Sequence, residues 1–248
     1  RITSTARVVE GEMRALVETN LKLLEEADRR LGPNPLAFAS RVVTSGDAEE
    51  GAGARSTLVA VFAADGRYLP PDRSASSVSA ADNPDFVALA QGEDWRVAPL
   101  QITALGRTFA VARRLERDGQ FAGVAAVYIP ADILTRTWLA ADLGSNSTLA
   151  VVRTDGELVT RFPVPAEDVP NASQTTLFTV QLKRADAGVF SAVSPIDGLN
   201  RRIAYRRVEN LPLVVSASVS SELIAAGFWR RLRQTALIAI LGQMGAPV

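Results

Sequence analysis

The stretch TFAVARRLERDGQFAGVAAVYIPADIL, residues 108–134, decides the fold. Its first half reads as a β-strand, and Asp118-Gly119 then supplies a dipeptide that is typical of tight hairpin turns. The second half is rich in Val and Ala and predicts the returning strand. Asp132 follows as an acidic start to a short helix. The stretch therefore predicts an antiparallel hairpin that leads into a helix.

Parts of this stretch and its surroundings recur later in the chain. RRLE at 113–116 recurs as RRVE at 206–209, 93 positions on, and VFAADG at 61–66 recurs as VVRTDG at 151–156, 90 positions on. Landmarks in the same order at a nearly constant offset indicate an internal duplication. We therefore expect an α+β chain with two tandem units, each holding an antiparallel sheet of about five strands.

The composition excludes several kinds of chemistry. The 248 residues include no Cys and no His, so disulfides, thiolate or imidazole metal sites, and Ser-His-Asp or Cys-His catalysis are ruled out. The 27 basic and 27 acidic residues balance, which gives no reason to expect a nucleic-acid partner. No cofactor or metal is expected.

An amphipathic pattern predicts a long helix over residues 5–31, before Gly32-Pro33 ends it. Opposite charges four positions apart, such as Glu25 and Arg29, support its polar face. Such a helix is about 40 Å long. It runs along both units, pairs with the same helix of a second chain, or packs as an ordinary core helix. Asn20, beside the apolar stripe, either fixes the register of a dimer or is solvated.

The first unit is expected to continue with a hairpin turned at Asp65-Gly66, a long loop over 70–83, and a helix that Asn83 or Asp82 caps and Gly92 ends. Loops of this length within a domain often cover binding sites. Strands are predicted at 58–62, 95–102, 108–115 and 120–129.

The second unit repeats this order. Strands are predicted at 148–153, 158–162, 177–182, 188–194, 201–208 and 213–219. The sequence shows no counterpart of the helix after Asn83, so this unit is expected to be smaller and more purely β.

The tail changes character at Phe228. The aromatic and basic cluster FWRRLRQ precedes TALIAIL, which favours the start of a truncated membrane span; an amphipathic helix of a soluble protein is the alternative. The expected divisions are 1–35 for the long helix, 36–141 and 142–224 for the two units, and 225–248 for this C-terminal helix and span.

The long helix, the two units with DG turns, RRLERDGQFAGV and the closing SPIDGLNRRIAYRRVENLPLVV together resemble double Cache (tandem PAS-like) sensor domains of bacterial transmembrane histidine kinases and diguanylate cyclases. The resemblance covers residues 5–228. It implies a periplasmic region of an inner-membrane receptor, held by flanking transmembrane helices and dimerised through the long helix. It also implies that the first unit lies far from the membrane and binds a small molecule, and that the region itself is not an enzyme.

One departure from the family bears on the ligand. Members that bind amino acids carry an Asp in the last strand of the first unit, within a V-D-I context, and here that context reads Val127-Tyr128-Ile129. Without this Asp an α-amino group loses its counter-charge. We therefore expect an organic acid, or another neutral or anionic small molecule, rather than an amino acid.

Seven side chains are candidates for the pocket of the first unit, because Arg can bind a carboxylate with two hydrogen bonds and aromatic rings form rigid walls. They are Trp95, Arg96, Thr103, Arg107, Phe109, Arg113 and Tyr128. Ordinary roles compete with this interpretation: the aromatic residues also suit the core, and Arg113, which recurs as Arg206, also suits a structural contact.

Two other functions remain open. One is a structural dimerisation module without a ligand. The other is a carboxylate-based hydrolase or lyase that uses Asp82, Asp85 or Glu93, although helix capping and solvation also explain these residues.

Overall fold

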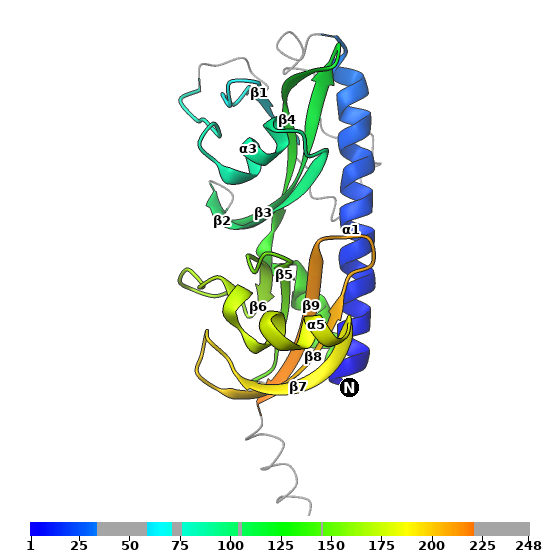
Figure 1. Ribbon diagram of the computed structural model, residues 1–248, viewed down its shortest axis with the longest axis vertical. Coiled ribbons are helices and arrows are strands. Elements are labelled where there is room, and N and C mark those ends of the chain that lie inside the picture. The colour runs from blue at the N-terminus through cyan, green and yellow to red at the C-terminus, as the bar shows by residue number, and fades with distance from the viewer. Residues whose placement is uncertain (34–58, 71–75, 104–105, 145, 221–248) are drawn as a thin grey trace, which may run out of the picture.

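The fold is described from a computed structural model, which describes residues 1–33, 59–70, 76–103, 106–144 and 146–220. One long helix runs beside two antiparallel sheets that are stacked end to end along it (Figure 1). The expected C-terminal helix and membrane span at 225–248 lie outside the described residues. Within the described residues, no helix is both long and apolar enough to cross a membrane.

The long helix α1 spans Ile2–Leu31 and confirms the predicted helix. Its buried stripe includes Val9, Met13 and Val17, and Gly32 ends it with φ of 66°, a left-handed conformation that favours glycine. Asn20 is buried, and its side-chain amide donates to Leu16 O of the preceding turn at 2.8 Å. The side chain of Asn20 is therefore hydrogen-bonded to the backbone of its own helix and is not solvated.

The first sheet has the strand order β1-β4-β3-β2. Its strands are β1 Val59–Ala63, β2 Trp95–Thr103, β3 Gly106–Arg117 and β4 Gln120–Pro130. Helix α3, Pro84–Ala90, begins as predicted at Asn83, whose side chain accepts from the backbone N–H groups of Asp85 and Phe86. The predicted hairpin of 108–134 is confirmed, with Asp118 and Gly119 at positive φ in its turn. A 3₁₀ turn, η2 Ala131–Leu134, and helix α4, Thr135–Ala141, then lead to the second sheet.

The second sheet has the strand order β6-β5-β9-β8-β7. Its strands are β5 Thr148–Arg153, β6 Leu158–Phe162, β7 Ala187–Val193, β8 Asn200–Arg207 and β9 Leu213–Ser220. The two sheets thus have four and five strands, close to the expected five each.

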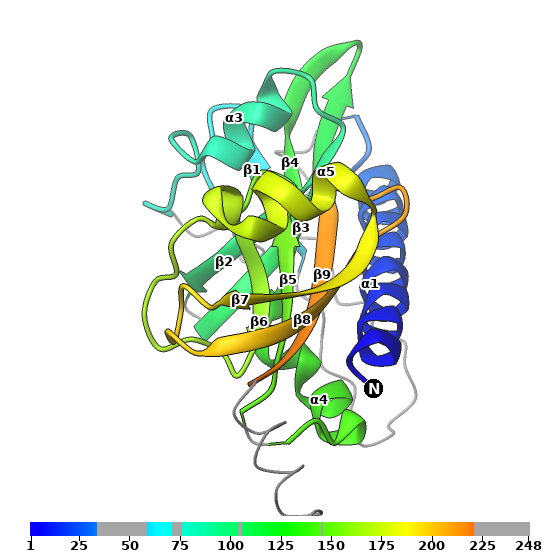
Figure 2. The ribbon, with the colours of Figure 1, turned by 60° about the horizontal axis from the view of Figure 1, so that its bottom comes forward.

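One prediction for the second unit is wrong, because the segment expected as a strand at 177–182 is helical. A 3₁₀ turn η3, Ala172–Gln174, precedes a π-helical turn η4, Leu177–Gln181, and a short α5, Leu182–Arg184. Leu177 and its neighbours pack on Tyr205, Val214 and Phe190 of the sheet. This tertiary contact selects the helical form for a short apolar run whose local pattern also fits a strand. Figure 2 shows η4 and α5 lying across the second sheet.

The two units share equivalent backbone hydrogen bonds. Arg114 N donates to Asp94 O in the first unit, and Arg207 N donates to Asp186 O in the second. The repeated RR pairs therefore occupy matching places at the strand ends. Both second arginines also bind nearby acceptors: Arg114 donates to Leu89 O at 2.7 Å, and Arg207 to Asp186 Oδ1 at 2.9 Å.

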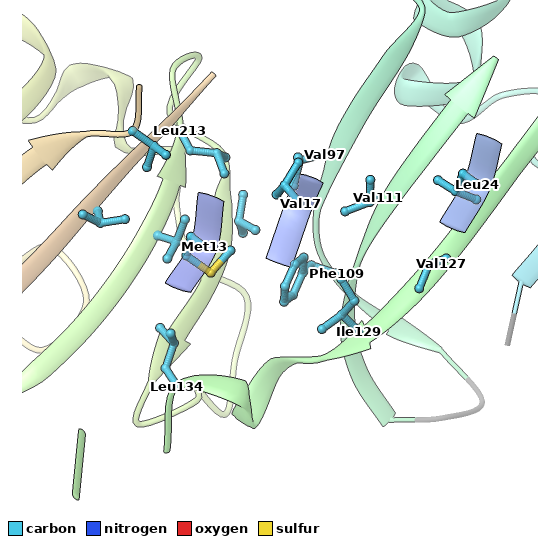
Figure 3. Packing of buried hydrophobic residues seen from close by; sticks show 14 of the residues in the cluster. Met13, Val17, Leu24, Val97, Phe109, Val111, Val127, Ile129, Leu134 and Leu213 are labelled. Atoms are coloured by element: carbon cyan, nitrogen blue, oxygen red, sulfur yellow. The ribbon is translucent and has the colours of Figure 1, made fainter. Parts of the chain in front are cut away.

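Helix α1 and one face of each sheet form a common core. Figure 3 shows Met13 and Val17 of α1 among Phe109, Leu134 and Leu213, which come from both halves of the chain. Burial of this continuous apolar surface ties the two units to one helix.

Candidate functional site

The first sheet has two faces with different neighbours. One face packs on α1 through residues such as Phe109, Val111 and Val127, and we call it the α1 face. The other packs on Phe86 and Leu89 of α3, and we call it the α3 face. Since side chains alternate along a strand, each residue of β1, β3 and β4 can be assigned to one face.

Three of the seven predicted site residues belong to the α1 side of the sheet. Phe109 is fully buried in the core against α1 (Figure 3). Trp95 packs against the same core. Arg113 donates to Glu25 Oε1 of α1 at 3.0 Å. The expectation that Phe109, Arg113 and Tyr128 line one pocket is therefore wrong, because Tyr128 lies on the α3 face. The prediction failed because Phe109 and Tyr128 lie on neighbouring strands but on opposite faces of the sheet. Tyr128 is paired with Ala110, and Phe109 is paired with Ile129.

Tyr128 is half-buried on the α3 face of β4. Its neighbours on this face include Tyr68, which follows the first hairpin. Burial raises the pKa of Tyr128 above its ordinary value of 10.0, and charge repulsion from Tyr68, which acts when that phenol is also ionised, raises it further. At neutral pH the phenol is therefore a neutral hydroxyl that can donate or accept one hydrogen bond.

Small residues form the sheet surface around Tyr128. Ala110 is its partner on β3, and Ala60, Ala112 and Ala126 belong to the same α3 face. Aromatic rings stand around this floor of methyl groups: Phe62 and Tyr68 lie 5.5 Å apart, and Phe86 and Phe121 lie 5.7 Å apart between ring centroids. The result is an aromatic surface with phenol hydroxyls as its polar groups.

Arg96, the other predicted residue near α3, is held in an ion-pair network. Its Nε donates to Asp85 Oδ1 at 2.6 Å, and Nη1 donates to both carboxylate oxygens of Glu93 at 2.7 Å. Arg153 of β5 donates to the same Asp85 oxygen at 2.6 Å. Arg96 is thus positioned by two carboxylates, and Asp85 joins the two units.

The last two candidates lie at the turn between β2 and β3. Thr103 Oγ1 donates to Gly106 O at 3.1 Å, and Arg107 donates to Ala166 O of the second unit. These contacts connect the turn to its surroundings, and they do not bring Thr103 or Arg107 to Tyr128.

The site residues chosen from the sequence did not include Tyr68, Phe86 and Arg153, which belong to this region. Tyr68 follows the DG turn by two residues, so its position beside the first strand was a usable signal. The role of Arg153 had no signal, because its contact with Asp85 joins residues that are 68 positions apart. Among the described residues, no group of three or more carboxylates is arranged to hold a metal ion.

Comparisons with known proteins agree with this architecture. Residues 131–218 match the dCache_1-like family, described as a histidine kinase sensor domain. No curated protein sequence matches the chain at a significant level.

Several solved structures share the fold over nearly the whole chain. The extracellular domain of rpHK1S-Z16, assigned as a histidine kinase, is 23% identical, with a TM-score of 0.65 over 90% of this chain and 93% of that one. The ligand-binding domain of the Pseudomonas fluorescens chemoreceptor CtaA, in complex with L-isoleucine, is 16% identical, with a TM-score of 0.62 over 90% of this chain and 92% of that one. That of the Pseudomonas aeruginosa amino-acid chemoreceptor PctB, in complex with L-Arg, is 14% identical, with a TM-score of 0.64 over 96% of each chain. The chain therefore shares the fold of these ligand-binding and extracellular domains, and its residues 131–218 match the dCache_1-like family.

Proposed function

We propose that this chain is the extracytoplasmic ligand-sensing region of a bacterial membrane receptor, and that its first unit binds a small molecule on the α3 face beside Tyr128. The observation that carries the proposal is the pair of half-buried phenols, Tyr68 and Tyr128, on a floor of alanines. This arrangement occurs in a fold whose solved examples include ligand-binding domains in complex with small molecules. Aromatic walls with a few polar groups are typical of such sites.

The ligand of the first unit is an organic acid or another neutral or anionic molecule. The CtaA and PctB domains are in complex with α-amino acids, whose ammonium group needs a negative partner. Strands β1, β2 and β4 contain no acidic residue, and Asp85 of α3 is already bound to Arg96 and Arg153. The α3 face therefore favours ligands without an ammonium group.

The same contacts support a binding role rather than a catalytic one. Of the carboxylates that a hydrolase would need, Asp85 accepts from two arginines and Glu93 accepts from Arg96. Asp85 and Glu93 therefore act as counter-charges to Arg96 and Arg153. The region is proposed to act on an output domain elsewhere in the full-length receptor.

Signal transmission is proposed to pass through α1 and the junction between the units. Arg117 of β3 donates to Gly32 O and to Asp28 Oδ1 near the end of α1, and Arg14 of α1 donates to Glu209 of the second unit. A ligand that moves β3 and β4 would thus shift α1 against the second unit, whose sheet lies beside the N-terminal half of the helix (Figure 1). We propose that α1 also forms the homodimer contact and that flanking helices hold the receptor in the inner membrane.

A thermal-shift panel tests the proposed ligand class. The 248-residue chain is heated with acetate, propionate, lactate, pyruvate, succinate, L-alanine and L-isoleucine. We expect at least one carboxylic acid to raise the melting temperature and the two amino acids to have no effect. Tyr128→Ala should abolish the shift of the first-unit ligand, while Tyr128→Phe keeps the ring and shows what the hydroxyl contributes. No response to any compound would instead favour a structural module, and turnover of a compound would show an enzyme.

A further inference from the structure

The second unit contains a cavity of its own. It lies on the face of the second sheet that is opposite to α1, has a volume of about 280 Å³, and is covered by residues 169–177 and 193–196. Its floor comes from all five strands of the second sheet, β5 to β9. A cavity of this size is near the lower end of the range for small-molecule sites, so it suits a molecule of a few carbon atoms.

Two buried arginines lie in this cavity. Arg161 of β6 is 7% exposed and Arg201 of β8 is 4% exposed, and both line it. They share one carboxylate, Asp197: Arg201 Nη2 donates to it at 2.6 Å and Arg161 Nη2 at 3.2 Å. Asp197 itself is not part of the lining. The cavity therefore faces two guanidinium groups and carries one excess positive charge.

This excess charge is costly in a buried place. Burial lowers the pKa of Arg161, and the neighbouring Arg201 lowers it further against the opposing effect of Asp197. With described residues Arg161 makes hydrogen bonds to Pro163 O and Asp197, which use two of the five N–H donors of a guanidinium. A bound anion would neutralise the excess charge and use the remaining donors.

Hydroxyl groups extend the polar end of the cavity. Ser218 Oγ lies 2.7 Å from Thr148 Oγ1 and 3.4 Å from Arg201 Nη1. Ser218 occupies the position in β9 that Tyr128 occupies in β4. Arg114 is paired with Val124 and Tyr128 lies four residues later, while Arg207 is paired with Val214 and Ser218 lies four residues later. The smaller side chain of Ser218 leaves space in the second unit that the phenol ring of Tyr128 occupies in the first unit.

The rest of the cavity is apolar. Leu158, Leu177, Phe190 and Ile203 line it. A ligand that fits both ends has one anionic group and a short aliphatic body. Inorganic anions such as phosphate suit the arginines but not this apolar wall.

We propose that the cavity of the second unit is a second binding site, for a small aliphatic monocarboxylate whose carboxylate is held by Arg161 and Arg201. The site is separate from the one on the α3 face of the first unit. The chain thus carries one ligand site in each repeat, and the second site lies in the unit that contacts the N-terminal half of α1.

Isothermal titration calorimetry of the 248-residue chain with acetate, propionate and butyrate tests this site. We expect affinity to rise about fourfold per added methylene, because each one is buried against the apolar wall. Butyramide, which has the same shape without the charge, should bind at least tenfold more weakly, and inorganic phosphate should fail to displace butyrate. Equal binding of butyramide and butyrate, displacement by phosphate, or no binding of butyrate would overturn the proposal.

A variant that fills the cavity locates the site without disturbing the ion pairs. Ala150 lines the cavity directly opposite Arg161 in the β5–β6 pair, so Ala150→Leu should fill it and abolish butyrate binding. Ala187→Leu, at an exposed position on β7 outside the cavity, is the matched control and should bind normally. Arg161→Lys keeps the charge but loses the planar fork, and should weaken binding about tenfold.

The first site is distinguished in the same experiment. Tyr128→Ala should leave butyrate affinity in the second unit unchanged, because Tyr128 belongs to the other sheet. Nuclear Overhauser effects from the butyrate methyl group to the methyl groups of Leu158 and Leu177 are expected. Unchanged binding in Ala150→Leu, or loss in Tyr128→Ala with no such effects, would place the ligand elsewhere and overturn the proposal.

Discussion

Arg153 of the second unit donates a hydrogen bond to Asp85 of the first unit at 2.6 Å, and the two side chains are only 9% and 10% exposed. Arg153 also donates to Val97 O of β2 at 3.0 Å. Asp85 lies in the first turn of α3, the helix that covers the proposed ligand face. A buried ion pair therefore connects the wall of the first site to the first strand of the second unit.

Removal of this carboxylate should destabilise the chain strongly. Asp85→Ala leaves Arg96 and Arg153 without their shared acceptor, and loss of one partner of a buried pair costs about 3–5 kcal/mol. Urea denaturation followed by circular dichroism measures the change. Arg29→Ala is the control: it removes an ion pair whose arginine is 75% exposed, and it should cost less than about 1 kcal/mol. Similar values for the two variants would contradict a role for Asp85 in joining the units.

Arg117 should hold the C-terminal turn of α1 on the first sheet. It donates to Gly32 O at 2.7 Å and to Asp28 Oδ1 at 2.6 Å, so it satisfies a helix-end carbonyl and a nearby carboxylate. In Arg117→Ala, hydrogen exchange measured by mass spectrometry should become faster in residues 27–32. Arg30→Ala, which lies on the same turn and within the described part of the chain pairs with Glu26 of the same helix, should leave exchange in the rest of α1 unchanged. Equal exchange in the two variants would show that Arg117 does not anchor the helix.

Acid should weaken the second unit through Asp197. Burial alone would raise the pKa of Asp197, but hydrogen bonds from Arg201, Ser194 and the Leu199 backbone outweigh it and hold the pKa below its ordinary value of 3.8. A carboxyl whose pKa is lower in the folded state stabilises the fold above the unfolded value, and this contribution is lost as pH falls below it. Asp197→Asn should therefore be less stable at pH 7 and lose less stability on acidification than the wild type.

The control for this pH dependence is Asp118→Asn. Asp118 is exposed in the β3–β4 turn with φ of 52°, a conformation that Asn also tolerates. Denaturation midpoints between pH 7 and pH 3 should follow the wild type in Asp118→Asn. A parallel loss of stability with acid in Asp197→Asn would contradict the assignment.

Tyr128 should ionise late in an alkaline titration. Burial and the nearby Tyr68 raise its pKa, and burial also raises that of Tyr205. Of the three tyrosines, these two should therefore ionise above pH 10 in the folded chain, as followed by ultraviolet absorbance. Since the neutral phenol is favoured in the folded state, its contribution to stability is complete below pH 10 and is lost as pH rises further. Tyr128→Phe should remove one late-ionising phenol, and an unchanged late phase would show that Tyr128 is solvated.

The elements that depend on local sequence patterns were predicted correctly. The 108–134 hairpin, α1 with its Gly32 end, and α3 with its Asn83 cap all have short-range signals: alternation, helical spacing and capping residues. Residues 177–182 were predicted wrongly because their helical form depends on Tyr205 and Phe190, which lie on strands later in the chain.

The site in the first unit was harder to predict because it depends on which face of the sheet each side chain occupies. Phe109 and Tyr128 each have the right chemistry for a pocket, but a single step of phase between β3 and β4 places one against α1 and the other against α3. Arg161 and Arg201 gave no signal at all, because the cavity they line is formed by segments far apart in the sequence.

Hydrogen exchange on the ligand-bound chain tests the central claim most directly. The Ala150→Leu variant, in which the second cavity is filled, is saturated with the carboxylic acid that stabilises it most in the thermal panel, and exchange is compared with the free protein. We expect slower exchange in Pro84–Ala90 and Gln120–Pro130, the segments around Tyr128, and loss of this effect in the double variant with Tyr128→Ala. Absence of any stabilising acid, or protection confined to residues 146–220, would contradict ligand sensing by the first unit.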